Sequence, residues 1–395
     1  MDTVAIIAEY NPMHNGHILN IEKAKEYSKA DNCLVIMSGS FTQQGNVACM
    51  DKFKRAKCAI ENGADIVVEL PVIYAVSSAE DFATGAVTIL NEMNIITHLA
   101  FGAETNNLNL LINIAKIYVN FEDEILFKIK QIKNAGINHA KACNLVLKDY
   151  LSEDEIIEIQ KPNNILAIEY LKALIRSKSQ IKPILVKREV SSHNSLEMSL
   201  NSKYASSTAI RNVLSSGEFC PVEKLNILND VIPKNTLNLL TKFNTNNSLF
   251  DVLKYEILKL NKDGLKCILD VNEGLENKLY NEISNSNSYE EFIFNVKSKR
   301  YTLSRIKRIC IYIILGITKE KKQTLKHVKY ARILKIKKSK TNILSMINKT
   351  SKIPVITKVI DNLSDDVLKE SLALDILANN LIGNINKDYT NNIIV

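Results

Sequence analysis

Residues 3–17 read TVAIIAEYNPMHNGH, and this stretch decides the fold. The apolar run at its start predicts a buried strand, and the polar segment after it leads into a helix that begins near His17. In an open parallel sheet the ligand crevice lies at the carboxyl ends of the strands, where the start of a helix directs free N–H groups and its positive dipole end outward. We therefore expect a phosphate-bearing ligand at this turn.

Two histidines in the turn are the candidate catalytic residues. His14 and His17 are three residues apart, so both can point at one anion from the first turn of a helix. Gly16 leaves room for a nucleotide to lie against the backbone. A single histidine near a strand end is more often structural, but two that flank a glycine at such a turn favour function. They would donate hydrogen bonds to phosphate oxygens as negative charge builds at the reacting phosphorus.

The first half of the chain alternates short apolar runs with helix-like stretches, which is typical of a parallel sheet covered by helices. The expected strands are Thr3–Glu9, Cys33–Ser38, Asp65–Leu70, His98–Gly102 and Ile181–Glu189, and the expected crossover helices are His17–Lys29, Asp51–Asn62 and Ala79–Asn91. Beyond about residue 216 helical periodicity dominates, with few strand signals. The pattern predicts an α/β fold with a Rossmann-like, parallel-sheet domain at residues 1–215, followed by a mainly α-helical, basic domain at residues 216–395.

Length and composition exclude several classes of protein. The chain has 395 residues, 46% of them hydrophobic and 24% charged, which fits a folded protein of two domains. No apolar run approaches the roughly 20 residues that cross a bilayer, so we expect a cytoplasmic protein with no membrane partner. The seven cysteines form no Cys-x-x-Cys pair, which argues against a disulfide framework and a zinc knuckle. We expect no metal ligated by the protein.

The positive charge is concentrated in the second half. The net charge of +8 divides into −3 for residues 1–220 and +11 for residues 221–395. Residues 297–340 alone contain 16 basic side chains and one acid, Glu320. Basic clusters are often solvated helix faces, and a membrane-surface helix is an alternative. We favour binding of a structured RNA, with Tyr301 and Tyr312 as stacking surfaces and these RNA-binding candidates: Lys299, Arg300, Arg305, Lys307 and Arg308.

A second segment, residues 205–211 with the sequence ASSTAIR, follows the last expected strand and opens a helix. Ser207, Thr208 and Arg211 would give a second grip for a polyphosphate tail and the leaving pyrophosphate. Taken alone, Ser-Ser-Thr before a helix is more often an N-cap. Its combination with the histidine turn favours the phosphate-binding interpretation.

These segments resemble the HxGH and ISSTxIR signatures of the class I nucleotidyltransferase superfamily. A closer resemblance, covering nearly the whole chain, is to the bacterial tRNA(Met) cytidine acetate ligase family. It is carried by the following segments: EYNP at 9–12, HNGH at 14–17, ELP at 69–71, KPNNIL at 161–166, SSTAIR at 206–211, EGLEN at 273–277, and KRYT at 299–302 with Arg305 and Arg308.

This resemblance implies an ATP-dependent ligase. Such an enzyme activates acetate as acetyl-adenylate and then acetylates the wobble cytidine of elongator tRNA(Met) to N4-acetylcytidine, with ATP and Mg²⁺ entering as substrate. The ATP-binding residues implied are Ile7, Ala8, Glu9, Tyr10, Asn11, Pro12, Met13, His14, Asn15, Gly16, His17, Ile18, Leu19 and Asn20, joined by Gly102, Asn163 and Arg188.

The chain departs from the family pattern at two positions. Met13 stands where Phe is common, a volume-tolerant apolar exchange. Gln44 stands where Arg is common, which removes a cation near the expected cleft. Lys52, Arg55 and Lys57 remain nearby, with a solvated basic helix face as the alternative interpretation.

Two other functions share parts of this pattern. A small-molecule adenylyltransferase of cofactor metabolism would need the first half but has no evident need for a basic second half. A non-catalytic RNA-binding protein could keep a vestigial nucleotide pocket, although the intact histidines argue against it.

Overall fold

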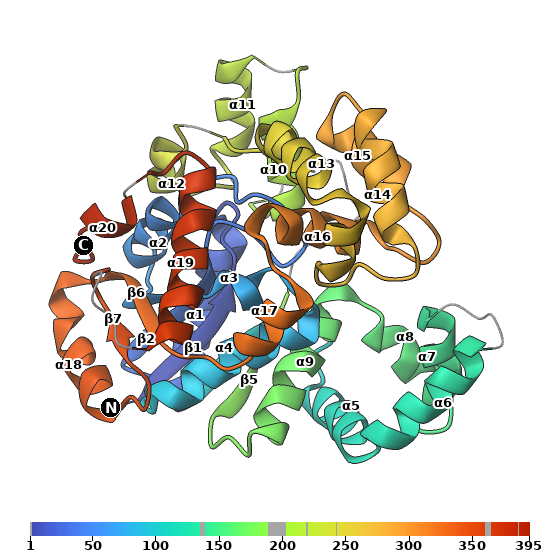
Figure 1. The fold of residues 1–395 in the computed structure, drawn as a ribbon. Coiled ribbons are helices and arrows are strands. Elements are labelled where there is room, and N and C mark those ends of the chain that lie inside the picture. Colours follow the sequence, from blue (N-terminus) through green and yellow to red (C-terminus); the bar gives the residue numbers. More distant parts are fainter. Residues whose placement is uncertain are drawn as a thin grey trace.

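A single sheet runs through the middle of the molecule in the order β5-β4-β1-β2-β3-β6-β7 (Figure 1). The computed structural model describes residues 2–134, 139–188, 203–218, 220–241, 243–359, 365–385 and 387–395. Within them the strands are β1 Thr3–Ala8, β2 Asn32–Ser38, β3 Ile66–Leu70, β4 His98–Ala103, β5 Lys182–Lys187, β6 Ala331–Ile336 and β7 Val355–Ile356.

The first five strands are parallel and confirm the α/β prediction. β1 pairs with β2 on one side and β4 on the other, and β3 and β5 extend the sheet outward. All five lie within two residues of the expected ranges. Because neighbouring parallel strands end at the same edge, the loops after β1, β4 and β5 meet there.

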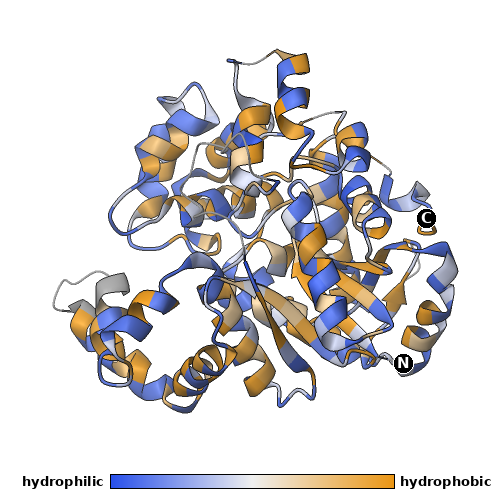
Figure 2. Cartoon of the chain, turned by 180° about the vertical axis from the view of Figure 1, so that it is seen from behind, coloured by the Kyte–Doolittle hydropathy of each residue, from blue (hydrophilic) through white to orange (hydrophobic). Residues whose placement is uncertain are grey.

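Both faces of the sheet are buried, which explains why its strands are continuously apolar. Val4 and Ile6 face a cluster that includes residues of α1 (Asn15–Ser28) and α2 (Lys52–Glu61). Ala5 faces the opposite cluster, which includes residues of α3 (Val72–Ala75), α4 (Ala79–Met93) and α9 (Pro162–Arg176). Figure 2 shows hydrophobic strands between helices that carry hydrophilic residues along part of their length.

Helices connect the parallel strands on both faces, as the alternating pattern predicts. Asp51 caps α2 as expected, since its carboxylate accepts the N–H groups of Phe53 and Lys54. The remaining helices of this half are α3 Val72–Ala75, α4 Ala79–Met93, α5 Leu108–Asn120, α6 Glu122–Asn134, α7 His139–Leu147, α8 Glu153–Ile159 and α9 Pro162–Arg176. Among the described residues, no helix is both long and apolar enough to span a membrane.

The second half is mainly helical, as predicted, but it also supplies two strands that the sequence pattern did not reveal. β6 pairs antiparallel with β3, and β7 pairs parallel with β6. The sheet therefore contains strands from both sides of the proposed boundary after residue 215. The helical elements from residue 207 onward are α10 Ser207–Ser215, which ends the first half, then α11 Pro221–Leu228, α12 Lys234–Leu239, η1 Asn246–Leu249, α13 Phe250–Cys267, α14 Leu275–Ser284, α15 Tyr289–Val296, α16 Leu303–Leu315, α17 Lys319–Thr324, η2 Lys338–Lys340, α18 Thr341–Thr350, α19 Asp366–Leu381 and α20 Lys387–Thr390.

A buried cluster of four charged side chains ties the two halves together. Lys52 Nζ lies 2.7 Å from Glu69 Oε1 and 2.9 Å from Asp388 Oδ1. Arg332 of β6 contacts the same two carboxylates at 3.1 and 2.6 Å. The solvated-face interpretation is therefore wrong for Lys52 and for Arg55, which are both fully buried. The sequence pattern did not predict β6, because Arg332 and Lys335 interrupt its apolar residues. Only the fold shows that the charge of Arg332 is neutralised by Glu69 and Asp388.

We predict that Lys52→Met lowers the free energy of unfolding by about 3–5 kcal/mol, because it leaves two buried carboxylates with one cation. Urea denaturation measures the change. The matched control is Lys57→Met on the exposed face of the same helix, which should change stability by less than about 0.5 kcal/mol. A Lys52 variant as stable as this control would contradict the assigned role of the cluster.

Candidate active site

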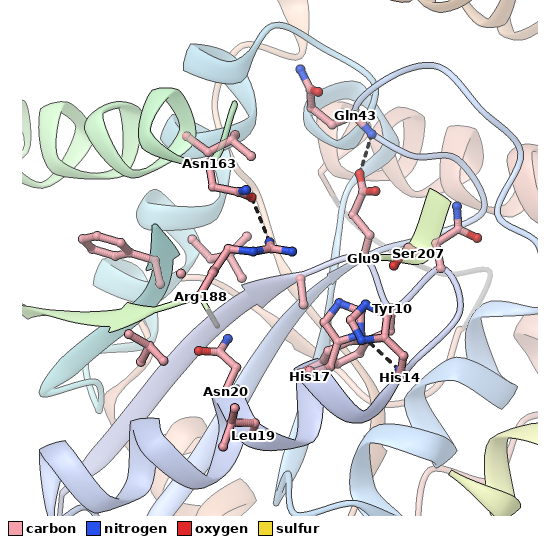
Figure 3. Close-up of a pocket in the computed structure, with 18 of the residues that line it drawn as sticks. Glu9, Tyr10, His14, His17, Leu19, Asn20, Gln43, Asn163, Arg188 and Ser207 are labelled. Atoms are coloured by element: carbon pink, nitrogen blue, oxygen red, sulfur yellow. Dashed lines mark hydrogen bonds between the residues drawn. The ribbon is translucent and has the colours of Figure 1, made fainter. Parts of the chain in front are cut away.

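A cavity of about 260 Å³ lies at the carboxyl ends of β1, β4 and β5 (Figure 3). Most of the predicted site residues line it. They are Ile7, Ala8, Glu9, Tyr10, Asn11, His14, Gly16, His17, Leu19, Asn20, Gly102, Asn163, Arg188 and Ser207. Residues more than 180 positions apart in the chain are thereby brought into one space.

His14 and His17 form a stacked pair at the start of α1. Their ring centroids are 3.7 Å apart with an angle of 26° between the planes, and the Tyr10 ring meets His17 edge-on at 4.9 Å. The backbone N–H of His14 donates to His17 Nδ1 at 3.2 Å. Because Nδ1 accepts, the proton of a neutral His17 ring sits on Nε2, where it can be donated to a ligand.

Both imidazoles are uncharged at neutral pH. Burial, with Arg188 and Arg211 nearby, lowers the pKa of His14 to about 3. Burial and the neighbouring His14 also hold the pKa of His17 well below its ordinary value. The pair can therefore act on a phosphate as neutral hydrogen-bond donors, while the positive potential comes from arginine.

Arg55 links the carboxyl ends of the neighbouring strands β1 and β2 through hydrogen bonds. Its guanidinium donates to the carbonyl oxygens of Glu9 at 2.6 Å and Ser38 at 3.1 Å, and also to that of Gly39. Its Nε donates to Met50 O at 3.1 Å. Sequence reasoning missed this role, because the carbonyl groups that Arg55 satisfies become neighbours only when β1 and β2 pair.

The predicted trio Gly102, Asn163 and Arg188 is brought together at the other side of the cavity. Arg188 Nη1 donates to Asn163 Oδ1 at 2.9 Å. A Cβ added to Gly102 would lie 3.2 Å from Arg188 Cγ, so the arginine side chain passes directly over this glycine. Glu104, which was not predicted, accepts the N–H groups of Asn163 and Asn164 and fixes the start of α9.

The start of α10 serves partly as an N-cap. Ser206 Oγ accepts the Ala209 N–H at 3.1 Å, so the capping alternative holds for that residue. Ser207 lines the cavity, whereas Thr208 and Arg211 do not. Arg211 instead donates to Asn11 O at 2.8 Å and to Thr208 Oγ1 at 3.2 Å. The first of these hydrogen bonds connects α10 with the turn that carries the histidines.

Four other predicted residues lie outside the cavity lining: Pro12, Met13, Asn15 and Ile18. Met13 is fully buried beneath the turn, and Asn15 donates to the carbonyl oxygens of Lys203 and Asp230. The cavity is completed by residues that were not assigned to it: Gln43, Gln44, Phe82, Phe101, Leu166, Tyr170, Val186 and Lys187. Gln44 thus lies at the cavity itself, and its side chain supplies no cation there. The apolar members looked like ordinary core positions of helices and strands.

The loop after β2 connects the cavity with α16. Gln43 and Gln44 line the cavity, and the backbone of Gly45, at φ +75°, packs against α16 at residues 307 and 308. Lys307 Nζ donates to Asn46 Oδ1 at 2.9 Å. The predicted RNA-binding helix and the cavity are therefore neighbours.

The five predicted RNA-binding residues differ in exposure. Lys299 and Arg300 are exposed, whereas Arg305, Lys307 and Arg308 are half-buried. Arg300 pairs with Glu273 at 3.4 Å, and Arg305 pairs with Asp270 at 3.6 Å.

The predicted stacking role of the two tyrosines is wrong for Tyr312. Its ring is buried and its hydroxyl donates to Val76 O, so no base can reach it. Tyr301 is also buried, with Arg305 lying 4.8 Å above its ring.

Several positive charges of residues 297–340 are used inside the fold. Lys319, Lys322 and Lys340 donate to backbone carbonyl groups, and Arg332 belongs to the buried ion cluster. This basic run is therefore not one continuous surface. Among the residues that the structure describes, no group of three or more His, Cys, Asp or Glu side chains could hold a metal ion.

Comparison with known proteins shows similarity along the whole chain. The family model described as HIGH Nucleotidyl Transferase matches residues 1–393. A tRNA(Met) cytidine acetate ligase of Clostridium novyi (strain NT) is 40% identical over 99% of this chain and 97% of its own length. One of Clostridium acetobutylicum is 38% identical over the full length of both chains.

Two crystal structures of Thermotoga maritima TmcAL have the same fold. The apo form is 28% identical, with a TM-score of 0.91 over 100% of this chain and 99% of its own. The form bound with alpha-thio ATP is 29% identical, with a TM-score of 0.85 over 96% of this chain and 93% of its own.

We predict that stability falls as the pH drops from about 6.5 to 5. The unfolded chain protonates residue 14 near pH 6.5, whereas the folded protein does not until about pH 3, so acid favours unfolding. For His14 alone the loss is up to about 2 kcal/mol at 1.36 kcal/mol per pH unit. Urea denaturation at each pH should show a shallower dependence for His14→Gln than for the wild type. His327→Gln, at an exposed position, is the control, and equal slopes for the two variants would refute the assignment.

Proposed function

Because the chain belongs to the HIGH nucleotidyl transferase family, and within it to the tRNA(Met) cytidine acetate ligases, we propose that it activates acetate with ATP and acetylates the wobble cytidine of elongator tRNA(Met). The product is N4-acetylcytidine. The observation that supports this most strongly is the stacked histidine pair at the start of α1, inside the cavity at the carboxyl edge of the sheet.

ATP occupies this cavity in the proposed mechanism. The TmcAL structure with alpha-thio ATP supports a nucleotide site on this fold. The triphosphate lies against Gly16 and accepts hydrogen bonds from His14 and His17, and Ser207 contributes at the start of α10. Gly102 allows close approach of the nucleoside beside Asn163, while Arg188 supplies positive charge. Mg²⁺ enters with ATP and is held mainly through phosphate oxygens.

The first chemical step is attack of an acetate oxygen on the α-phosphorus of ATP. Pyrophosphate leaves, and acetyl-adenylate forms. The protein contributes positioning and hydrogen bonds to the phosphate oxygens, and no covalent enzyme intermediate is needed. Each neutral imidazole keeps one N–H group that can donate to a phosphate oxygen in this step.

The second step transfers the acetyl group to the cytidine amine. The tRNA approaches from the side of α16, because the loop that carries Gln43 and Gln44 joins this helix to the cavity. Exposed Lys299 and Arg300, together with Arg305, Lys307 and Arg308, contact phosphate groups of the RNA.

Incubation with ATP, labelled acetate and tRNA tests the proposal directly. Label in cytidine of the tRNA supports the ligase. Nucleotide transfer to a small molecule instead would favour a cofactor adenylyltransferase, and RNA binding without ATP turnover would favour a non-catalytic protein. Either of these two results contradicts the proposal.

We predict that His17→Ala lowers ATP turnover by at least about 100-fold while tRNA affinity stays within about twofold. The reason is that His17 binds the triphosphate of ATP in the proposed mechanism and does not contact the tRNA. Acetate-dependent ATP–pyrophosphate exchange and a gel shift measure the two properties. A gel shift that is lost in this variant would contradict the separation of roles.

The converse variant, Arg300→Ala with Arg308→Ala, should weaken tRNA binding by tenfold or more and leave acetate-dependent exchange within about twofold. Its affinity should also depend less steeply on salt concentration, since fewer counterions are released. Lys254→Ala on α13, elsewhere on the basic half, is the control and should change neither property. Unchanged tRNA affinity in the double variant would refute the role of α16.

A further inference from the structure

The cavity contains a carboxylate where phosphate groups are expected. Glu9 directly follows β1, at the carboxyl end of this strand. In Figure 3 its side chain points from the strand towards Gln43. It is the only Asp or Glu among the described residues that line the cavity. A carboxylate repels a triphosphate, so its presence calls for a role other than holding ATP.

The Glu9 carboxylate is held in place. Its Oε1 accepts the backbone N–H of Gln43 at 2.7 Å, and Arg55 donates to its backbone carbonyl at 2.6 Å. Among the described residues, no hydrogen bond to the other oxygen, Oε2, accompanies this contact. One oxygen is thus anchored, and the other is available to a substrate in the cavity.

Its surroundings make this carboxylate more basic than an ordinary one. Burial raises the pKa of Glu9 against the opposing effects of the Gln43 N–H, Arg211 and Arg55. The other titratable groups that line this space are Tyr10 after β1, His14 and His17 at the start of α1, Tyr170 of α9, Lys187 at the end of β5 and Arg188 after it. A carboxylate with a raised pKa is better matched to proton transfer near neutral pH.

We propose that Glu9 is a catalytic residue of the acyl-transfer step, in which it receives the cytidine amine and accepts its proton. This inference rests on the proposed function. The amine nitrogen attacks the carbonyl carbon of acetyl-adenylate and forms the new C–N bond. The bond from that carbon to the phosphate oxygen breaks, AMP leaves with the electron pair, and the surplus proton of the nitrogen passes to Oε2 of Glu9.

The histidines and the basic side chains in the lining are poor acceptors for this proton. His14 and His17 have lowered pKa values, which make them weak bases, and Lys187 and Arg188 are cations. One wall of the cavity is apolar and suits the flat cytosine base and the methyl group of the acetyl-adenylate. It consists of Phe82, Phe101, Leu166 and Tyr170, with the Phe101 and Tyr170 rings 5.9 Å apart.

Measuring the two half-reactions separately tests this role. ATP–pyrophosphate exchange with acetate reports activation, and single-turnover transfer from enzyme-bound acetyl-adenylate to tRNA reports acyl transfer. We expect Glu9→Gln, which keeps an oxygen for the Gln43 N–H, to slow transfer by about 100-fold or more and activation by less than about tenfold. Glu9→Asp, which keeps a shorter base, should retain more transfer than Glu9→Gln.

The pH profile distinguishes a base from a merely structural residue. Wild-type transfer should rise with pH as Glu9 loses its proton, and this rise should disappear in Glu9→Gln. Glu26→Gln on the exposed surface of α1 is the matched control and should change neither half-reaction.

Three results would overturn the proposal. Equal losses in both half-reactions would assign Glu9 to ATP or magnesium binding, and full-rate transfer by Glu9→Gln would remove it from catalysis. A wild-type protein without acetate-dependent ATP–pyrophosphate exchange would refute the proposed function, and the role of Glu9 with it. Failure of the proposed function is thus seen in the wild type, and failure of the Glu9 role alone is seen only in the Glu9 variants.

Discussion

The hydrogen bonds of Arg55 are the constraint on which the active-site region depends. Parallel strands leave carbonyl groups at their carboxyl ends, and burying such groups without a partner costs about 1–3 kcal/mol each. One buried guanidinium satisfies four of them, at the end of β1, at the end of β2 and in the loop that follows β2. With this anchor the loops after β1 and β2 are held at the carboxyl edge of the sheet, where both contribute residues to the cavity, among them Glu9, His14 and Gln43.

The same requirement, that buried charges be paired, explains how the second half joins the first. Arg332 of β6 and Asp388 near the carboxyl end of the chain share a buried cluster with Lys52 and Glu69. Lys387 adds a contact of 2.6 Å to Asp51, the cap of α2. Part of the positive charge of the second half therefore stabilises the fold, and the charge available to RNA is smaller than the composition suggests.

Within the cavity, charge and hydrogen bonding are divided among different residues. Burial and the positive charge of Arg188 lower the pKa of both histidines, and Arg211, behind the turn, adds to this effect at His14. The histidines can then donate hydrogen bonds directly, and Glu9 is left as the carboxylate of the site. This division fits a reaction in which negative charge builds on phosphorus in one step and a proton leaves an amine in the next.

The sequence by itself determined the five parallel strands, their crossover helices and the placement of His14, Gly16 and His17 at a strand-to-helix turn, because periodicity and capping are local properties. It also pointed to Gly102, Asn163 and Arg188, through resemblance to a family. Tertiary structure alone decided that Lys52 and Arg55 are buried, that Tyr312 cannot stack on a base, and that β6 extends the sheet. Each of these depends on partners far away in the chain, and no local pattern encodes which distant carboxylate or carbonyl group a side chain will meet.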